Sequence, residues 1–454
     1  MKIIVNFAGM RRLFHNLMLG ALLFLTAACS KESRFDIDTR RSTPDSGGRA
    51  ETETRAIPAT DRRVMLMVFG GRNNLARYLR EDVATLEASD IPGSNYLSDD
   101  VLLVLSRVTK AGESTSQPCP AVLYQLYKGR DGAPVRDTLK VWADFEPVFG
   151  SNMIEESLTL AWNRYPAAGY GLVLSSHASG WLPAKYYADP AAYERDHPVT
   201  SSIRPMARRL TDIARESFPP VPAFPAVKSI GQDVDLSSSE EMELTDFVGS
   251  IPFKLDYILL DACLNGCVEV AWALKDKARY VGFSPTEVLA DGFDYSLLTT
   301  RLLQPRPDPQ AVLEDYMAQY KKNSQSPWAT ISLVDTEKLD DLAAACAPLF
   351  EKYRSALRHL SGDLVQRYFR ANYHFYYDLR DILVKVGIDA DELATLDAAL
   401  DACVVYKDCT PTFFSIEMVS YSGLSMYLPS MGSAVLDKFY KENITWNDAS
   451  GLIN

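Results

Sequence analysis

A histidine and a cysteine each end a short apolar run of strand length in this chain. One run extends from Tyr170 to His177, and the other from Leu255 to Cys263. In open α/β sheets, active-site residues collect at the carboxyl ends of the strands. If the two strands are neighbours, a thiol nucleophile and an imidazole base face each other across one edge of the sheet. The pattern therefore predicts the chemistry of a cysteine peptidase.

A cysteine thiol needs its surroundings to make it nucleophilic, because an ordinary thiol has a pKa of about 8.5. We expect Cys263 to lie between a strand and the start of a helix, whose dipole favours the thiolate. His177 would serve as its base or ion-pair partner. The backbone N–H groups of Ala178, Ser179 and Cys263 are the candidate donors to an oxyanion. A lone buried cysteine is usually inert, so the prediction depends on the pair.

A second Asp-Ala-Cys string ends at Cys403, but its surroundings predict a helix. The residues before it are rich in alanine and lack a β-branched run. Leu393, Leu396 and Leu400 recur at the helical spacing of three and four. We therefore expect Cys403 to lie on a helix face and to have a structural role.

Strands and helices alternate along residues 61–300, which we expect to form the catalytic domain. Such alternation is typical of a mostly parallel sheet with helices on both faces, so we predict an α/β fold. Besides the runs that end at His177 and Cys263, the expected strands are 63–69, 100–105, 121–127 and 280–283, and the expected helices are 75–86, 152–162 and 266–277.

Helical patterns dominate residues 301–454, which we expect to form a C-terminal region that packs on the catalytic domain. The predicted helices are 309–322, 337–358, 362–386 and 390–406. A strand pair is predicted at 413–420 and 424–428.

The chain begins with the pattern of an export signal. Arg11 and Arg12 precede an apolar stretch at 17–28, which is shorter than the about 20 residues that cross a bilayer. Small residues directly before Cys29 resemble a bacterial lipobox. We therefore predict that residues 1–29 are a lipoprotein signal and that Cys29 is lipidated. An ordinary secretory signal is the alternative.

Residues 30–60 are expected to tether the folded part of the chain to this lipid. They carry charges of both signs and few apolar side chains to bury, so we expect them to be flexible. The mature protein would then be an exported lipoprotein held at a membrane, in the periplasm or on the cell surface.

Composition limits the partners of the chain. The formal net charge is −12, which disfavours nucleic acid as a partner. The seven cysteines include no Cys-x-x-Cys pair, so we predict neither a metal site nor a disulfide framework.

Four blocks of the sequence resemble the clostripain family of cysteine peptidases, within the caspase-like clan. They are an opening strand and turn at 68–75, a histidine block at 172–181, a nucleophile block at 258–266 and a closing strand at 422–429. The resemblance implies a caspase-like sheet and a dyad of His177 and Cys263. One departure is Ala178, where the family commonly has glycine, and this substitution puts oxyanion binding in question.

The resemblance also implies cleavage of protein or peptide substrates after Arg or Lys. An acidic group would then lie in the P1 pocket, and Asp261 matches that position. Ser284, in the segment that continues the nucleophile block, is a second candidate for substrate binding. The alternative for Asp261 is that it only braces the turn, since a negative charge close to Cys263 would raise the thiol pKa.

Several alternatives stay open from the sequence. A binding lipoprotein that kept the fold and lost the activity, or a peptidase with a non-basic P1 preference, would share these blocks. Relatives are often cut at a basic residue, and the loop at 182–228 offers several. No cofactor is required by the residues. Some relatives need calcium, and although the chain has no EF-hand-type loop, calcium stays open as a cofactor.

Overall fold

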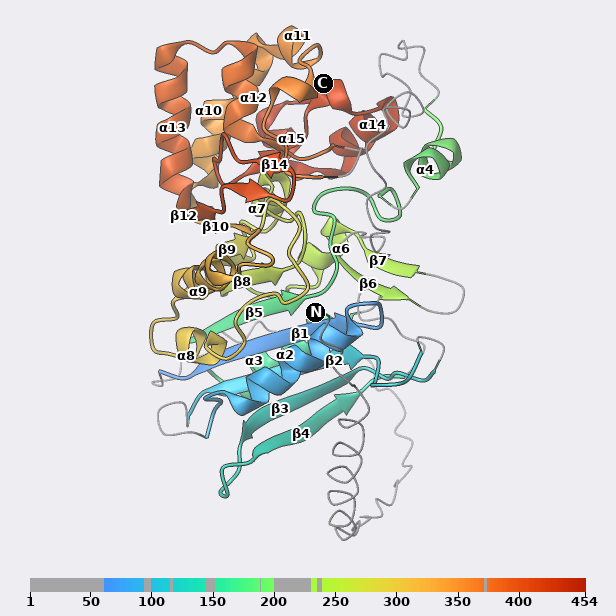
Figure 1. Cartoon of the computed structure of the whole chain (residues 1–454), viewed down its shortest axis with the longest axis vertical. Coiled ribbons are helices and arrows are strands. Elements are labelled where there is room, and N and C mark those ends of the chain that lie inside the picture. Colours follow the sequence, from blue (N-terminus) through green and yellow to red (C-terminus); the bar gives the residue numbers. More distant parts are fainter. Residues whose placement is uncertain are drawn as a thin grey trace, which may run out of the picture. The chain divides into compact units, whose positions relative to one another are not determined.

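Nine strands form one mixed sheet in the computed structural model of the protein (Figure 1). Across the sheet they follow the order β12-β10-β9-β8-β5-β1-β2-β3-β4. The five strands from β9 to β2 run parallel, while both edges are antiparallel. Their bounds are β1 (Arg63–Gly71), β2 (Val101–Val108), β3 (Val122–Lys128), β4 (Pro134–Val141), β5 (Gly169–Ser175), β8 (Leu255–Asp261), β9 (Ala278–Phe283), β10 (Thr330–Asp335) and β12 (Val404–Cys409). This mostly parallel sheet confirms the predicted α/β fold.

The structure describes residues 61–93, 99–114, 117–143, 152–187, 189–199, 230–234, 239–370 and 374–454. The predicted signal with Cys29, the predicted tether and most of the loop at 182–228 lie outside these residues. Within them, no helix combines the length and the apolar character that a membrane crossing requires.

The two strands that carry the predicted dyad are neighbours in the middle of the sheet. β5 and β8 run parallel, with Ser175 opposite Asp261. All of β5 is buried, and in β8 only Asp256 is partly exposed. A parallel strand covered on both faces needs apolar residues throughout, not in alternation, and this explains why both runs stand out in the sequence. Because the register is fixed, both strands end at the same level of the sheet edge.

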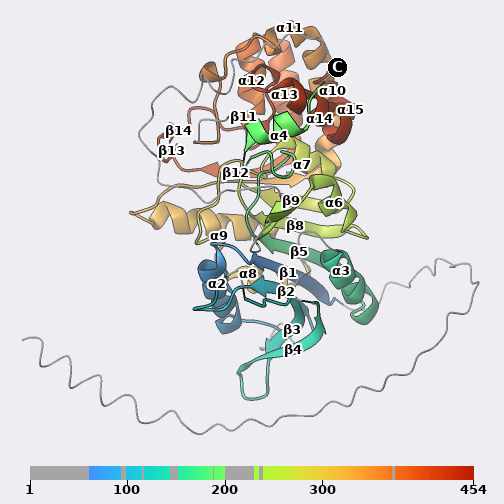
Figure 2. The same ribbon diagram turned by 90° about the vertical axis from the view of Figure 1, so that its right-hand side faces the viewer.

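Helices cover both faces of the sheet, as predicted (Figure 2). One face carries α2 (Ala76–Ala88), α8 (Leu298–Leu302) and α9 (Pro309–Lys322). The other face carries α3 (Met153–Arg164), α6 (Leu244–Gly249) and α7 (Val268–Ala273). In Figure 2, α2 and α9 lie to the left of the strands, and α3 and α6 lie to the right. The sheet therefore separates two apolar cores.

The C-terminal region is largely helical, as predicted, and it also extends the sheet, because β10 and β12 lie beyond residue 300. Besides α9, its helices are α10 (Leu339–Lys352), α11 (Arg354–Leu357), α12 (Leu379–Val386), α13 (Ala390–Cys403), α14 (Ala434–Asn443) and α15 (Thr445–Ser450), with 3₁₀ turns at 336–338, 362–364 and 429–431. The short helix α4 (Pro190–Asp196) precedes this region in the chain. As expected, Cys403 lies on a buried helix face.

Three expectations for this region were wrong in detail. The helix predicted at 362–386 begins only at Leu379. Before it, Tyr368, Phe369 and Tyr376 lie in non-helical segments, and their rings are buried in the core. The helix predicted at 390–406 ends at Cys403 and continues directly as β12. Strand pairs are present but between other partners: β13 (Thr412–Phe413) with β14 (Ile416–Glu417), and β11 (Tyr377–Asp378) with β15 (Ser425–Met426). A further hairpin, β6 (Ile230–Val234) with β7 (Ser239–Met242), was not anticipated.

Candidate active site

The ends of β5 and β8 bring His177 and Cys263 to one pocket. Both residues line it, together with the start of α2, the segment 287–292 and Arg370. The histidine is 3% exposed and the cysteine 8% exposed. The nucleophile and the base predicted from two separate strings thus share one small, closed site.

In this structure His177 is bonded to Asn74 and not to the thiol. The distance from its Nε2 to Asn74 Oδ1 is 2.6 Å. Because an amide oxygen can only accept, Nε2 carries the hydrogen and Nδ1 is left as the basic nitrogen. Burial lowers the pKa of His177 to about 4. The imidazole is therefore neutral at physiological pH, in the form that can take a proton from a thiol.

Cys263 is capped by the main chain of one residue, Val288. The Val288 N–H donates to Sγ at 3.3 Å, and Sγ donates to the Val288 carbonyl at 3.6 Å. Burial, followed by the negative charge of Glu287, raises the pKa of Cys263 to about 12. The resting thiol is thus protonated.

The predicted help from a helix dipole is not found in this structure. Cys263 is followed by a non-helical turn in which Leu264 has φ 60°, and α7 begins only at Val268. The dipole acts within about one turn of a helix end, so α7 begins too late in the chain to provide the predicted effect.

The turn after His177 tolerates alanine where the family commonly has glycine. Left-handed backbone in this turn occurs at Gly180, with φ 57°, and not at Ala178. A Cβ at Gly180 would collide with the Leu264 carbonyl, so the glycine also lets the histidine loop pack on the nucleophile loop. Ala178 and Ser179 are fully buried beside the pocket. The departure at Ala178 therefore imposes no backbone strain here.

Asp261 lies in the wall of the pocket and is braced. Its Oδ2 accepts hydrogen bonds from Tyr295 at 2.6 Å and Ser175 at 3.0 Å. Burial raises the pKa of this carboxyl, and the bonds from Tyr295 and Ser175 counteract that effect. Gly292 covers the carboxylate so closely that a Cβ there would collide with Oδ2. The carboxylate is therefore near the reacting groups, and it is closed off from solvent.

Ser284 lies outside the wall of this pocket. It is fully buried at the end of β9, and its hydroxyl lies 2.9 Å from that of Thr330 and 3.3 Å from that of Thr286. These contacts join the loop after β9 to β10. In this arrangement its hydroxyl is engaged in holding the loop that covers the thiol.

The residues that close the site could not be predicted from the sequence. Glu287 and Arg370 form a two-pronged ion pair, with Oε2 to Nε at 2.7 Å and Oε1 to Nη2 at 3.2 Å. Arg370 also lies over the Phe414 ring, with 4.0 Å to its centroid. The pair joins residues that are 83 apart in the chain. Its position next to Val288 ties down the segment that caps Cys263. No local pattern could have signalled it.

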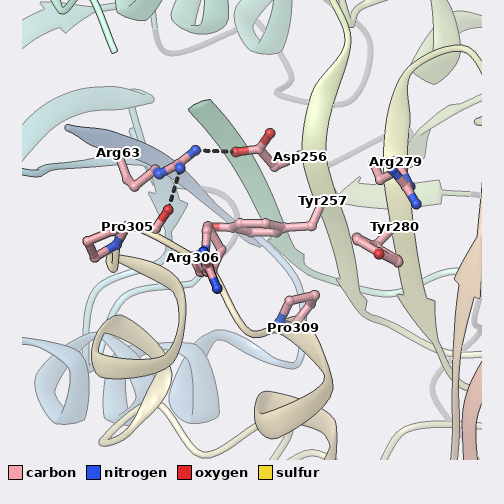
Figure 3. A pocket seen from close by; sticks show the side chains of 9 residues that line it. Arg63, Asp256, Tyr257, Arg279, Tyr280, Pro305, Arg306 and Pro309 are labelled. Carbon is pink, nitrogen blue, oxygen red and sulfur yellow. Dashed lines mark hydrogen bonds and ion pairs between the residues drawn. The ribbon is translucent and has the colours of Figure 1, made fainter. Parts of the chain in front are cut away.

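Another hollow opens near the beginnings of the central strands (Figure 3). The Arg63 guanidinium donates to Asp256 at 3.0 Å and to the Pro305 carbonyl. Arg279 at its rim is held by Asp335 and Glu337. The acid–arginine pairs brace strand ends here, and the lining contains neither histidine nor cysteine. The residue types for thiol catalysis are found at the other pocket.

No group of His, Cys, Asp or Glu side chains in the described ranges is arranged to hold a metal ion. The six cysteines described are free thiols.

Comparisons with known proteins can be set beside this geometry. The model of the clostripain family, Peptidase_C11, matches residues 223–449. An inactive zymogen C11 protease from Parabacteroides distasonis is 25% identical, with a TM-score of 0.67, over 87% of this chain and 99% of that one. A secreted C11 cysteine protease from Bacteroides thetaiotaomicron, in complex with an irreversible peptide inhibitor, is 21% identical, with a TM-score of 0.64, over 86% of this chain and 98% of that one. No curated protein sequence matches. The sheet, the helices on both faces and the family match agree, and the chain belongs to the clostripain family of cysteine proteases, with their caspase-like fold.

Proposed function

We propose that this protein is an exported cysteine endopeptidase that cleaves after Arg or Lys through His177 and Cys263. The observation that carries the proposal is the register of β5 and β8, which brings both side chains to one pocket. The family match adds the reaction class. The buried acid Asp261 supports the basic P1 preference, because a carboxylate in a low dielectric pairs strongly with guanidinium or ammonium.

The steps follow from the proton positions in the site. Nδ1 of His177 is unprotonated and takes the thiol proton as Cys263 attacks the substrate carbonyl. The imidazolium then protonates the leaving amine, and His177 later activates water to hydrolyse the acyl-enzyme. Backbone N–H groups of Ala178, Ser179 and Cys263 would hold the oxyanion.

The closed pocket corresponds to a precursor state in this proposal. A thiol capped by Val288 and protonated cannot attack, so the segment 287–292 must move before catalysis. The Parabacteroides relative is described as an inactive zymogen. We place the activating cut at a basic residue within 182–228, in line with the basic specificity.

Export and anchoring complete the proposal. The Bacteroides relative is described as secreted, and the pattern of residues 1–29 is that of a lipoprotein signal. A lipid on Cys29 and a tether at 30–60 would hold the catalytic domain at a membrane surface.

One alternative is a binding lipoprotein on the same fold, and the capped, protonated thiol favours it over a constitutively active enzyme. The test is hydrolysis of Arg and Lys reporter peptides by the full-length protein and by Cys263→Ala, before and after limited proteolysis, with and without calcium. Activity that disappears in the variant supports the proposal. Absence of activity under every condition supports the binding protein, and cleavage only after other residues removes Asp261 from the P1 pocket.

A further inference from the structure

Four buried polar atoms without a hydrogen-bond partner in the described structure gather behind the active-site pocket. They are Oδ2 of Asp82, Oδ1 of Asp261 and the hydroxyl oxygens of Tyr316 and Tyr320. Electrostatic interactions connect these groups, and the Phe293 N–H favours the ionised form of Asp261. Buried polar atoms are nearly always paired, so a cluster of unpaired ones is suited to bind a polar ligand or water.

The helix α2 runs from the pocket to this cluster. Leu75 and Leu79 line the pocket next to the catalytic pair. Asp82 follows Leu79 by three residues and therefore lies on the same helix face, one turn further along. It is only 8% exposed. Gly292 both lines the pocket and presses against Asp261, and Asp261 itself lies in the pocket wall. Asp261 therefore belongs both to the pocket and to this cluster.

The acids and tyrosines of this cluster have the chemistry of a cation-binding site. The charges of Asp82, Asp261 and Asp291 repel one another. The rings of Tyr316 and Tyr320 lie 4.8 Å apart, centroid to centroid. Carboxylates form charge-assisted hydrogen bonds with guanidinium and ammonium groups, and aromatic faces attract the same cations.

No positive group counters the acids from the elements around Asp82, as far as the structure describes them. The titratable groups that face it are Asp261 on β8, Asp291 in the segment after β9, Glu81 on α2 itself, Tyr295 in the segment before α8, and Tyr320 on α9. The metal-type clusters that a divalent ion needs are absent from the described residues. An organic cation from a substrate side chain is therefore the occupant that fits.

We propose that Asp82 is a specificity-determining residue that, together with Asp261, binds the terminal cation of a P1 arginine or lysine. The inference depends on the proposed basic specificity and extends it from one carboxylate to two, supplied by different elements. When the segment 287–292 moves away from Cys263, Gly292 moves with it, and the route from the pocket to both carboxylates opens.

Without a substrate, Asp82 holds a proton that the substrate cation would replace. Burial raises the pKa of Asp82 to about 8, and Asp261 and Asp291 add to this effect. At pH 7 Asp82 is therefore mostly neutral. A guanidinium beside it favours the ionised form and lowers its pKa again. Binding of a basic P1 residue should release a proton to solvent, and binding of a neutral residue of similar length should not.

The first experiment measures kcat/KM of the activated full-length protein on matched peptides with arginine, lysine or norleucine at P1. We expect Asp82→Asn to lower kcat/KM for arginine and lysine by at least about tenfold and to leave norleucine within about twofold. The matched control is Asp391→Asn, because Asp391 is an exposed acid in the first turn of α13 and is not among the charges that act on Asp82. It should behave as the unmodified protein does.

The second measurement does not depend on how well Asp82→Asn folds. Binding of the arginine and norleucine peptides to Cys263→Ala is followed by calorimetry at pH 7 in two buffers of different ionisation enthalpy. Release of close to one proton with arginine and none with norleucine supports the proposal. Equal release with both peptides overturns it.

The outcomes separate this inference from the function on which it depends. If the unmodified protein prefers basic P1 residues and Asp82→Asn keeps that preference, Asp82 has no part in specificity and the proposed function stands. If the unmodified protein shows no basic preference, the proposed specificity itself fails and this inference fails with it.

Discussion

The main chain of Val288 and the thiol of Cys263 are bonded to each other in both directions, with N–H to Sγ at 3.3 Å and Sγ to carbonyl at 3.6 Å. The main chain of Val288 thus engages the thiol of Cys263 both as a donor and as an acceptor. A substrate carbonyl cannot approach the sulfur while this contact lasts. Removal of Val288 from the sulfur is therefore the step on which reactivity depends.

The pH dependence of alkylation tests this closed state. In the closed state described here the pKa of Cys263 is about 12, so the thiolate fraction rises tenfold with each pH unit below that value. We expect the rate of Cys263 modification by iodoacetamide to rise continuously from pH 7 to pH 10. Subtracting the rate of Cys263→Ala isolates this cysteine from the others. A plateau below pH 9 would contradict the capped thiol.

The ion pair between Glu287 and Arg370 is expected to hold the cap in place. Breaking it with Arg370→Gln leaves Glu287 buried without its main partner, which typically costs about 3–5 kcal/mol. Part of that cost is avoided if the segment 287–292 opens. We therefore expect the alkylation rate of Cys263 at pH 8 to rise about tenfold or more.

A matched control for that variant exists elsewhere in the fold. Arg380→Gln breaks another two-pronged pair, with Asp397, between α12 and α13. It should leave the alkylation rate unchanged. Similar rates in Arg370→Gln and Arg380→Gln would show that the Glu287 pair is not a latch.

Asn74→Ala should impair proton transfer more than substrate binding. Asn74 is the partner that fixes the hydrogen of His177 on Nε2, and without it the ring loses its orientation and its tautomer preference. We expect kcat of the activated protein to fall about 10- to 100-fold with KM within about threefold, within the range ascribed to acid–base catalysis. The exposed Asn443→Ala serves as control. A loss confined to KM would assign Asn74 to substrate binding instead.

Asp82→Asn should stabilise the folded protein at neutral and alkaline pH. The pKa of Asp82 is raised to about 8 in the fold, whereas an unfolded aspartate ionises near pH 3.9. The folded state then binds the extra proton, so stability falls as pH rises between these values. Each unit of difference corresponds to about 1.4 kcal/mol. Urea unfolding at pH 5 and pH 8 should show that the free energy of unfolding of Asp82→Asn exceeds that of the unmodified protein by an amount that grows with pH. A difference independent of pH would contradict the raised pKa of Asp82.

Glycine substitutions around the histidine loop have opposite expected effects. Ala178→Gly should leave kcat/KM within about twofold, because Ala178 has an ordinary backbone conformation. Gly180→Ala should destabilise the protein by about 1–3 kcal/mol or more, because Gly180 is left-handed and a Cβ would meet the Leu264 carbonyl. Thermal unfolding of both variants checks the prediction. A large rise in activity in Ala178→Gly would show that the alanine limits oxyanion binding.

The central strands could be predicted because strands that are buried on both faces consist of unbroken apolar runs. His177 and Cys263 were identified in this way, and the structure brings them to the same pocket. The edge strands β4 and β12 were missed, and so was the fully buried β10. β4 exposes polar side chains along its length, and β12 continues directly from a helix, so neither carries a strand-like pattern.

The rest of the site depends on contacts between distant parts of the chain. Glu287 meets Arg370 and Asn74 meets His177 only after folding, and neither pairing has a local signature. Asp82 resembles any acid on an amphipathic helix until the fold buries it. The same limit explains the helix wrongly predicted at 362–386, where the aromatic residues follow no helical period and are placed by the core they fill.

The cap on Cys263 also bears on how the thiol withstands oxidation. Oxidation by peroxide and disulfide exchange both require a thiolate that reagents can reach. Cys263 in the closed form is protonated and shielded, and most of the other free cysteines described are buried as well. A chain that enters an oxidising compartment in this form would keep its nucleophile in the reduced state until the cap is removed. The closure that keeps Cys263 unreactive thereby also protects its sulfur from oxidation.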